Sequence, residues 1–237
     1  MGKGWKTTIK SANAQKKGLI FTKLAREIQV AVKAGGADPN MNARLRMAID
    51  AAKKESCPND TIERAIKKGS GQLNDGEIIE ELTYEGYGPH GVGVIVECQT
   101  NNKHRTAPEM RNLFKGHEGA LGETGSVAWM FDRVCLVEGS KSGTFDPEEE
   151  AIEVGANEVE TTEDEHGKVH YEFFGAPESL DAIRKALTAR GWTVTKAELS
   201  YKAKNKTELT EAQLKEVQEF LSEVDDFDDT HRVHVTL

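Results

Sequence analysis

Residues 62–84 read IERAIKKGSGQLNDGEIIEELTY and contain the point at which the hydrophobic pattern of the chain changes. On the N-terminal side, apolar residues recur at intervals of three to four, which is typical of an amphipathic helix. On the C-terminal side they alternate with polar residues, which is typical of a strand with one buried face. The polar, glycine-rich segment 70–76 separates the two patterns and is predicted to be a linker.

Three helices are predicted before the linker. Gly35-Gly36 stops the first, Asn42 caps the second, and Gly69 closes the third. Their apolar stripes consist, in chain order, of Ile20, Leu24, Ile28 and Ala31, then Leu45, Ile49 and Ala52, then Ile62, Ala65 and Ile66. These helices predict a small N-terminal domain.

After the linker, a helix is predicted at residues 103–117, and strands are predicted at 77–84, 91–98 and 126–133. Val127, Trp129 and Phe131 alternate in the third strand, so Trp129 is interpreted as a core residue and not as a stacking platform. Residues 86–91 match the pattern G-x-G-x-x-G. A strand follows the third glycine where dinucleotide binding would need a helix, so we predict a hairpin turn there.

The following part of the chain has the predicted order β-α-β-β-α-β, which is the ferredoxin-like pattern. A last helix at 211–224 and a last strand at 232–237 would complete the preceding α+β unit, which otherwise has only one helix. We therefore predict an α+β fold: an N-terminal three-helix domain of residues 1–72 followed by two α+β domains. The second domain comprises residues 77–133 plus 206–237, and the ferredoxin-like third domain, residues 134–205, is inserted in it.

The charge of the chain divides at the same boundary. The whole chain has a formal net charge of −9, which taken alone argues against nucleic-acid binding. Residues 1–72 carry 15 basic and 6 acidic side chains, whereas residues 73–237 carry 16 basic and 34 acidic ones. Such an asymmetry points to contact of the basic part with nucleic acid or with a membrane.

The basic side chains of residues 1–72 are arranged as expected for phosphate contacts. Lys23, Arg26 and Lys33 fall opposite the apolar stripe of the first helix, and the third helix carries a second basic face. A solvated lysine-rich face is the alternative, but a body of net charge −18 would repel nucleic acid unless one end were specialised to hold it. The candidate nucleic-acid-binding residues are Lys3, Trp5, Lys10, Lys16, Lys17, Lys23, Arg26, Lys33, Arg44, Arg46, Lys53, Arg64, Lys67 and Lys68.

The sequence gives little support for other classes of protein. No apolar run approaches the length of a membrane span, and no secretory signal peptide is expected, so a cytoplasmic location is predicted. The three cysteines are far apart, as expected of reduced thiols. Histidines and cysteines show no ligand spacing, so no metal and no cofactor is expected. No nucleophile, Walker or paired-carboxylate motif appears, so neither enzymatic activity nor a small-molecule substrate is expected.

Seven motifs in order along the chain resemble the YebC family, described as probable transcriptional regulatory proteins and related to mitochondrial translational activators of cytochrome c oxidase. They are FTKL at 21–24 with REI at 26–28, GG and DP at 35–39, RLR at 44–46, IERAIKKG at 62–69, YEGYGP at 84–89, NKHRT at 102–106 and GETGSVAWMF at 122–131. The chain departs from the family at its start, where SANA at 11–14 replaces part of a denser basic run. The resemblance implies a helical domain and two α+β domains, the third inserted in the second.

The resemblance also implies a function in gene expression. It favours a DNA-binding transcriptional regulator that grips phosphates with its basic N-terminal domain. The alternative is a ribosome-associated translation factor that binds ribosomal or transfer RNA and relieves stalling, for example at proline runs. Both nucleic acids offer phosphates, so charge alone leaves both open. Loop residues that match the family and would contact a partner such as the ribosome are Tyr87, Pro89, His90, Asn102 and Arg105.

Overall fold

The computed structural model describes residues 14–73, 78–163 and 167–237, with side chains from residue 17 onward. The chain forms two compact units. One unit is Phe131–Lys204, and the other contains the described residues up to Met130 together with Asn205–Leu237. Part of the predicted linker, residues 74–76, lies outside the described residues. In the described part of the chain, no helix is both long enough and apolar enough to cross a bilayer.

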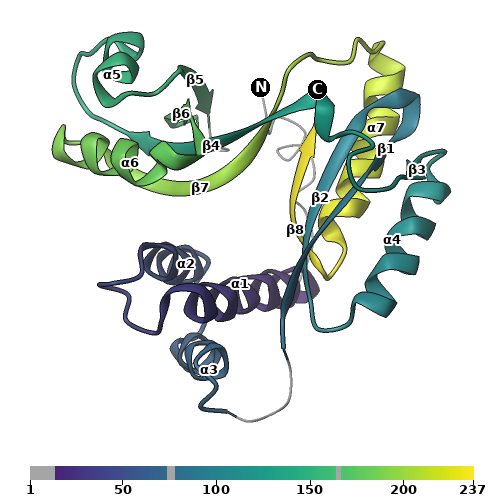
Figure 1. Cartoon of the computed structure of the whole chain (residues 1–237), viewed down its shortest axis with the longest axis horizontal. Coiled ribbons are helices and arrows are strands. Elements are labelled where there is room, and N and C mark those ends of the chain that lie inside the picture. Colours follow the sequence, from purple (N-terminus) through teal and green to yellow (C-terminus); the bar gives the residue numbers. More distant parts are fainter. Residues whose placement is uncertain (1–13, 74–77, 164–166) are drawn as a thin grey trace. The chain divides into compact units, whose positions relative to one another are not determined.

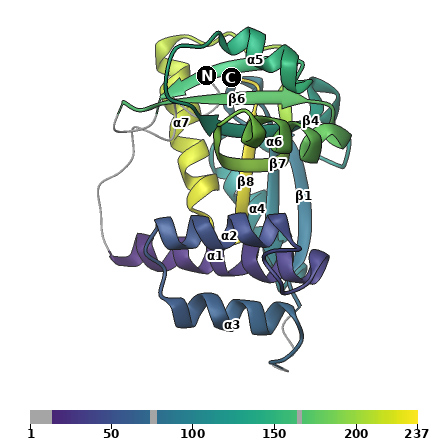
Figure 2. The ribbon, with the colours of Figure 1, turned by 90° about the vertical axis from the view of Figure 1, so that its left-hand side faces the viewer.

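The three predicted N-terminal helices are confirmed as α1 (Ala14–Gly35), α2 (Ala43–Lys54) and α3 (Asn59–Gly69). Helix α1 packs against both others and lies between them in Figure 2. Asn42 fixes the turn before α2, because its Oδ1 accepts the Leu45 N–H at 3.0 Å while its amide donates to the Ala31 carbonyl at 2.7 Å. The helices enclose a core of Ile28, Ala31, Val32, Leu45, Ala48, Ala52, Cys57, Ile62 and Ala65.

The same unit contains an antiparallel sheet of order β3-β1-β2-β8. Its strands are β1 (Glu80–Tyr87), β2 (Gly93–Thr100), β3 (Ala120–Leu121) and β8 (Thr230–Val235). Helices α4 (Lys103–Gly116) and α7 (Glu211–Asp226) cover one face of it (Figure 1). Because the C-terminal strand β8 pairs with β2, the intervening unit is inserted in this one, as predicted.

The inserted unit has the predicted order β-α-β-β-α-β, with a sheet of order β5-β6-β4-β7 in which all neighbouring strands are antiparallel. Its elements are β4 (Phe131–Ser140), α5 (Pro147–Val154), β5 (Glu158–Glu163), β6 (Val169–Gly175), α6 (Leu180–Ala189) and β7 (Thr193–Ala203). Both helices pack on this sheet around buried Phe173 and Trp192. The α+β fold class predicted from the sequence is therefore confirmed.

The predicted strand at residues 126–133 is wrong for residues 126–130 and right for residues 131–133. Ala128–Met130 forms a 3₁₀ turn, and strand β4 starts only at Phe131. The buried carboxylate of Glu85 accepts the backbone N–H groups of Gly125, Val127 and Ala128 at 2.8–3.0 Å. These groups are therefore not available to a β-ladder.

Trp129 is also not a core residue. Its side chain is 65% exposed, and its indole N–H donates to the Ser126 carbonyl at 3.0 Å. The phenol of Tyr87 donates to the same carbonyl at 3.2 Å. The turn that Glu85 organises thus holds two aromatic side chains at the surface.

The G-x-G-x-x-G segment is a turn between the antiparallel strands β1 and β2, as predicted. It contains the short 3₁₀ turn Pro89–Gly91, in which His90 has a φ of 60°. No helix starts at Gly91, so the segment lacks the geometry of a dinucleotide-binding loop.

We expect Glu85→Gln to lower the free energy of unfolding by about 2 kcal/mol, because an amide replaces one charged acceptor of buried N–H groups with a donor. Hydrogen exchange at Gly125, Val127 and Ala128 should accelerate more than exchange elsewhere in the sheet. Glu123→Gln, on the same turn but exposed, is the control and should change stability by less than about 0.5 kcal/mol. Equal exchange rates in both variants would show that the carboxylate does not hold the turn.

Candidate nucleic-acid interface

The predicted cations of the helical region fall into two groups. Three of them, the inner cations Lys23, Arg26 and Arg44, contact other parts of their own unit. Five exposed ones form a second group, called here the outer cations: Lys33, Arg46, Lys53, Arg64 and Lys67. Lys17 is also exposed, and Lys68 is half-buried. Lys3, Trp5 and Lys10 lie outside the described residues, as does the side chain of Lys16 in α1.

Arg26 joins α1 to the turn before β8. Its Nη1 donates to the Asp228 carbonyl at 2.6 Å and lies 3.0 Å from the Asp229 carboxylate. The Arg26 side chain is 15% exposed, and that of Asp229 is fully buried. One turn earlier on the same helix, the Lys23 ammonium donates to the Asp225 carbonyl at the end of α7. These contacts attach the first helix to the C-terminal part of the sheet's domain.

Asp229 is the centre of a buried polar cluster. Besides Arg26, its carboxylate accepts hydrogen bonds from Arg105 Nη2 at 2.9 Å, Thr106 Oγ1 at 2.7 Å and Thr100 Oγ1 at 3.0 Å. Burial alone would raise the pKa of Asp229, but the hydrogen bonds from Arg105 and Thr106 and the charge of Arg26 outweigh it and lower the pKa. Arg105, predicted as a partner contact, thus binds Asp229.

Glu27 forms a second link between α1 and the sheet. Its carboxylate accepts Arg44 Nε at 2.8 Å and Gln99 Nε2 at 2.6 Å, and it lies 3.2 Å from His231 Nε2. Arg44 also donates to Glu81 at 2.7 Å. Burial opposes ionisation of Glu27, yet the hydrogen bond from Arg44 and the charges of His231 and Arg44 lower its pKa. The inner cations therefore have carboxylate or carbonyl partners within the protein.

Because of these two carboxylates, the free energy of unfolding of this unit depends on pH in the acidic range. The pKa of each is lowered on folding, so its stabilising contribution is fully present above the ordinary value, 4.5 for Glu27 and 3.8 for Asp229. The contribution is lost as the pH falls through the lower, folded-state pKa. We expect urea midpoints to stay constant from pH 7 to about 5 and to fall below about pH 4. A midpoint that rose on acidification would contradict the ion-pair assignment.

The outer cations differ from the inner ones because none of the residues that the structure describes is their partner. In the described part of the chain, none of these five side chains forms an ion pair or a hydrogen bond. Arg46 and Lys53 are two turns apart on α2, while Arg64 and Lys67 are one turn apart on α3. Lys54, which is not among the predicted residues, is exposed beside Lys53. Unpartnered, solvated cations of this kind are suited to contact phosphate oxygens.

The predicted partner-contact residues are divided between surface and structural positions. His90 is exposed and its Nε2 lies 2.6 Å from Glu216, whereas Pro89 is buried. Tyr87 is partly exposed beside Trp129. Asn102 caps α4, since its Oδ1 accepts the Arg105 N–H at 3.2 Å. Of the five, Tyr87 and His90 present aromatic or imidazole surface to solvent.

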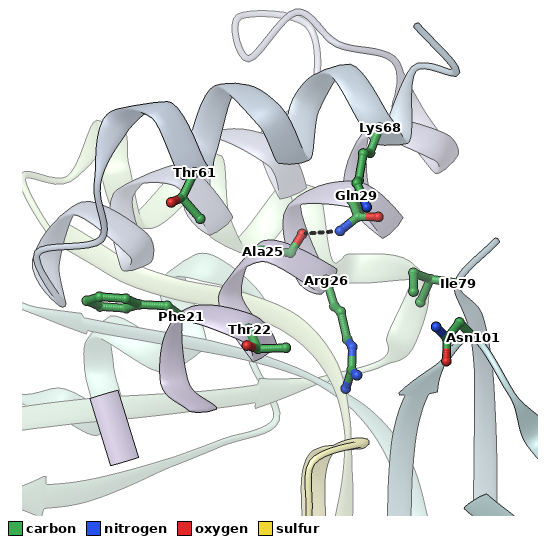
Figure 3. Close-up of a pocket in the computed structure, with 9 residues that line it drawn as sticks. All are labelled: Phe21, Thr22, Ala25, Arg26, Gln29, Thr61, Lys68, Ile79 and Asn101. Carbon is green, nitrogen blue, oxygen red and sulfur yellow. Dashed lines mark hydrogen bonds between the residues drawn. The ribbon is translucent and has the colours of Figure 1, made fainter. Parts of the chain in front are cut away.

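A cavity of about 330 Å³ lies beside α1 and α3 (Figure 3). Helix α1 contributes Phe21, Thr22, Ala25, Arg26 and Gln29 to its wall, α3 contributes Thr61 and Lys68, and the flanks of the sheet contribute Ile79 and Asn101. Of these nine residues, only Arg26 and Lys68 are among the candidate site residues predicted from the sequence. Helical spacing places Thr22, Arg26 and Gln29 on one face of α1, but no local signal indicates which segments face them.

The comparisons with known proteins agree over the whole chain. Residues 4–72 match a family described as the TACO1/YebC protein N-terminal domain, and residues 79–237 match the TACO1/YebC second and third domain. A probable transcriptional regulatory protein of Bdellovibrio bacteriovorus is 72% identical over 237 residues, and the match covers all of both chains. One from a Polaromonas species is 46% identical over 242 residues, covering 100% of this chain and 99% of the relative.

A solved structure agrees as well. The crystal structure of a conserved hypothetical protein from Aquifex aeolicus is 38% identical and superposes with a TM-score of 0.82. The match covers 97% of this chain and 93% of that one. Similarity in sequence and in fold therefore extends over nearly the full length.

Proposed function

The chain belongs to the TACO1/YebC family, and on that premise we propose that it is a non-enzymatic, nucleic-acid-binding regulator of gene expression. In this proposal the outer cations grip phosphates, and the inner cations hold the helical region to the sheet. The acidic remainder of the chain repels nucleic acid, so binding is confined to the outer cations. Relatives of this chain are named probable transcriptional regulatory proteins, which makes duplex DNA the first target to test.

The observation that carries the proposal is the difference between the two groups of cations. If residues 1–72 were basic only to neutralise the acidic body, the outer cations would also be expected to have carboxylate partners. They have none in the described part of the chain, although the inner cations Arg26 and Arg44 do. A set of exposed, unpaired lysines and arginines on a chain of net charge −9 supports a polyanionic ligand.

A ribosome-associated translation factor is the second candidate. The cavity beside α1 and α3 favours it, because a cavity of this size suits one unpaired nucleotide. Unpaired bases are displayed mainly by the loops and bulges of folded RNA. The same outer cations would then contact RNA phosphates, and the partner-contact residues Tyr87 and His90 would lie against the ribosome.

Cross-linking in cells, followed by sequencing of the attached nucleic acid, tests the proposal and separates the two candidates. Enrichment of discrete promoter DNA would support transcription, and enrichment of ribosomal or transfer RNA would support translation. A double variant, Arg64→Glu with Lys67→Glu, serves as the control and should lose the enrichment in either case. Recovery of no nucleic acid above the level of this variant would refute the proposal.

A further inference from the structure

The cavity beside α1 and α3 combines cations with an apolar wall. Two cationic residues, Arg26 and Lys68, contribute to its lining, and none of the described residues that line it carries a carboxylate. Phe21 and Ile79 contribute apolar surface. In Figure 3, Phe21 and Thr61 lie at one end of the cavity, and Ile79 and Asn101 lie at the other. Such a lining favours an anionic ligand that also has a flat apolar part.

The cavity also offers hydrogen-bonding groups. Arg26 contacts Asp228 and Asp229 through Nη1, and within the described residues its Nε and Nη2 have no partner. Gln29 donates from Nε2 to the Ala25 carbonyl at 3.3 Å, while its side-chain oxygen accepts no hydrogen bond from any described residue. Asn101 supplies a second amide. Amides offer both donors and acceptors, so they can bond the 2′-hydroxyl of a ribose, which is itself a donor and an acceptor.

The volume limits what can enter. About 330 Å³ is near the lower end of the range for small-molecule sites, so the cavity suits a single nucleotide and excludes a base-paired duplex. Helix α3, which contributes to the wall of the cavity, also carries the outer cations Arg64 and Lys67. A nucleic-acid strand bound by those two cations would therefore pass close to the cavity.

We infer that this cavity takes one unpaired nucleotide of the bound nucleic acid, as found in a loop of folded RNA. The base lies against Phe21 at the end of the cavity where Thr61 lies, and the sugar and phosphate extend toward the other end. There Gln29 and Asn101 bond the sugar, and Lys68 and the remaining donors of Arg26 hold the phosphate. This inference rests on the proposed function, since it assigns a substrate class to the surface that the outer cations form. It adds a preference for unpaired over paired nucleotides.

The test compares two RNAs by fluorescence anisotropy at one salt concentration: a hairpin with a five-nucleotide loop and a blunt duplex of the same length. We expect the full chain to bind the hairpin about tenfold more tightly, since stacking of one base has an effect of this order. Thr61→Phe fills the cavity without changing charge and should reduce hairpin affinity to that of the duplex. Thr188→Phe, the same substitution on exposed helix α6 of the other unit, should leave the preference intact.

A second variant keeps the test decisive if Thr61→Phe fails to fold. Gln29→Ala removes an amide from the cavity wall and should lower the hairpin preference severalfold, with duplex affinity unchanged. Equal affinity of the unmodified chain for hairpin and duplex, or a preference that survives both variants, would overturn the inference while leaving the phosphate grip in place. Absence of binding to either RNA and to duplex DNA would instead refute the proposed function itself.

Discussion

Replacing Asp229 with alanine is expected to lower the free energy of unfolding by about 3–5 kcal/mol. Its fully buried carboxylate accepts hydrogen bonds from Arg105, Thr100 and Thr106 and pairs with Arg26. Removal of this one side chain leaves two guanidinium groups and two buried hydroxyls without their acceptor. The cost is large because the unpaired charges remain partly buried, not because the ion pair itself is strongly stabilising.

Urea denaturation followed by circular dichroism measures this effect. Asp228→Ala is the matched control, because Asp228 is the neighbouring residue, is exposed, and engages Arg26 only through its backbone carbonyl. The control should change stability by less than about 0.5 kcal/mol. If both variants were equally stable, Asp229 would not organise the contact between α1 and the sheet.

Reversal of two outer cations, Arg64→Glu with Lys67→Glu, is expected to weaken binding of duplex DNA or RNA by about a hundredfold or more near 0.1 M salt. Each phosphate contact on B-DNA contributes about 0.9 to the slope of log affinity against log salt. At 0.1 M this amounts to roughly eightfold per contact, so two lost contacts give about sixtyfold, and repulsion by the new carboxylates adds to it.

Lys115→Glu is the control for net charge. Lys115 is exposed on α4, in the same unit but outside the helical region, so the substitution makes the chain more acidic without touching the outer cations. Its effect on affinity should be less than about threefold. Lys115→Glu changes the net charge by −2 and the double reversal changes it by −4. A loss in log affinity half as large as that of the double variant would therefore mean that binding follows total charge and not these cations. Circular dichroism should show an intact helical region, because the reversal weakens the C-terminal end of α3 by only about 1–2 kcal/mol.

Much of the fold could be predicted because its determinants are local. Apolar spacing and the cap at Asn42 define the helices, and the alternation of half-buried Leu82 and Tyr84 with exposed Thr83 defines strand β1. The insertion could also be predicted, because the last helix and strand complete a unit that would otherwise lack them. The helices and strands depend on neighbours within a few positions of each other, and the insertion follows from the order of these elements along the chain.

The errors arose where a distant residue determines the local structure. Residues 126–133 alternate like a strand, but Glu85, about forty positions earlier, binds their N–H groups and turns the chain. Likewise, a helical wheel shows that Lys23 and Arg26 avoid the apolar stripe. It does not show that they meet carbonyl and carboxylate groups some two hundred residues away. The charges in a sequence therefore predict that a surface is basic more reliably than they predict which of its cations can bind a ligand.

We expect the contacts of the outer cations with phosphates to make the affinity for nucleic acid depend steeply on salt, and a salt titration tests this claim. With five contacts, log affinity for duplex DNA should fall with a slope of about −4.5 against log salt, which is a loss of about 500-fold between 50 and 200 mM. A steep loss that is reduced by the Arg64→Glu, Lys67→Glu double variant would support the claim. An affinity that changed by less than about threefold over that range would contradict it.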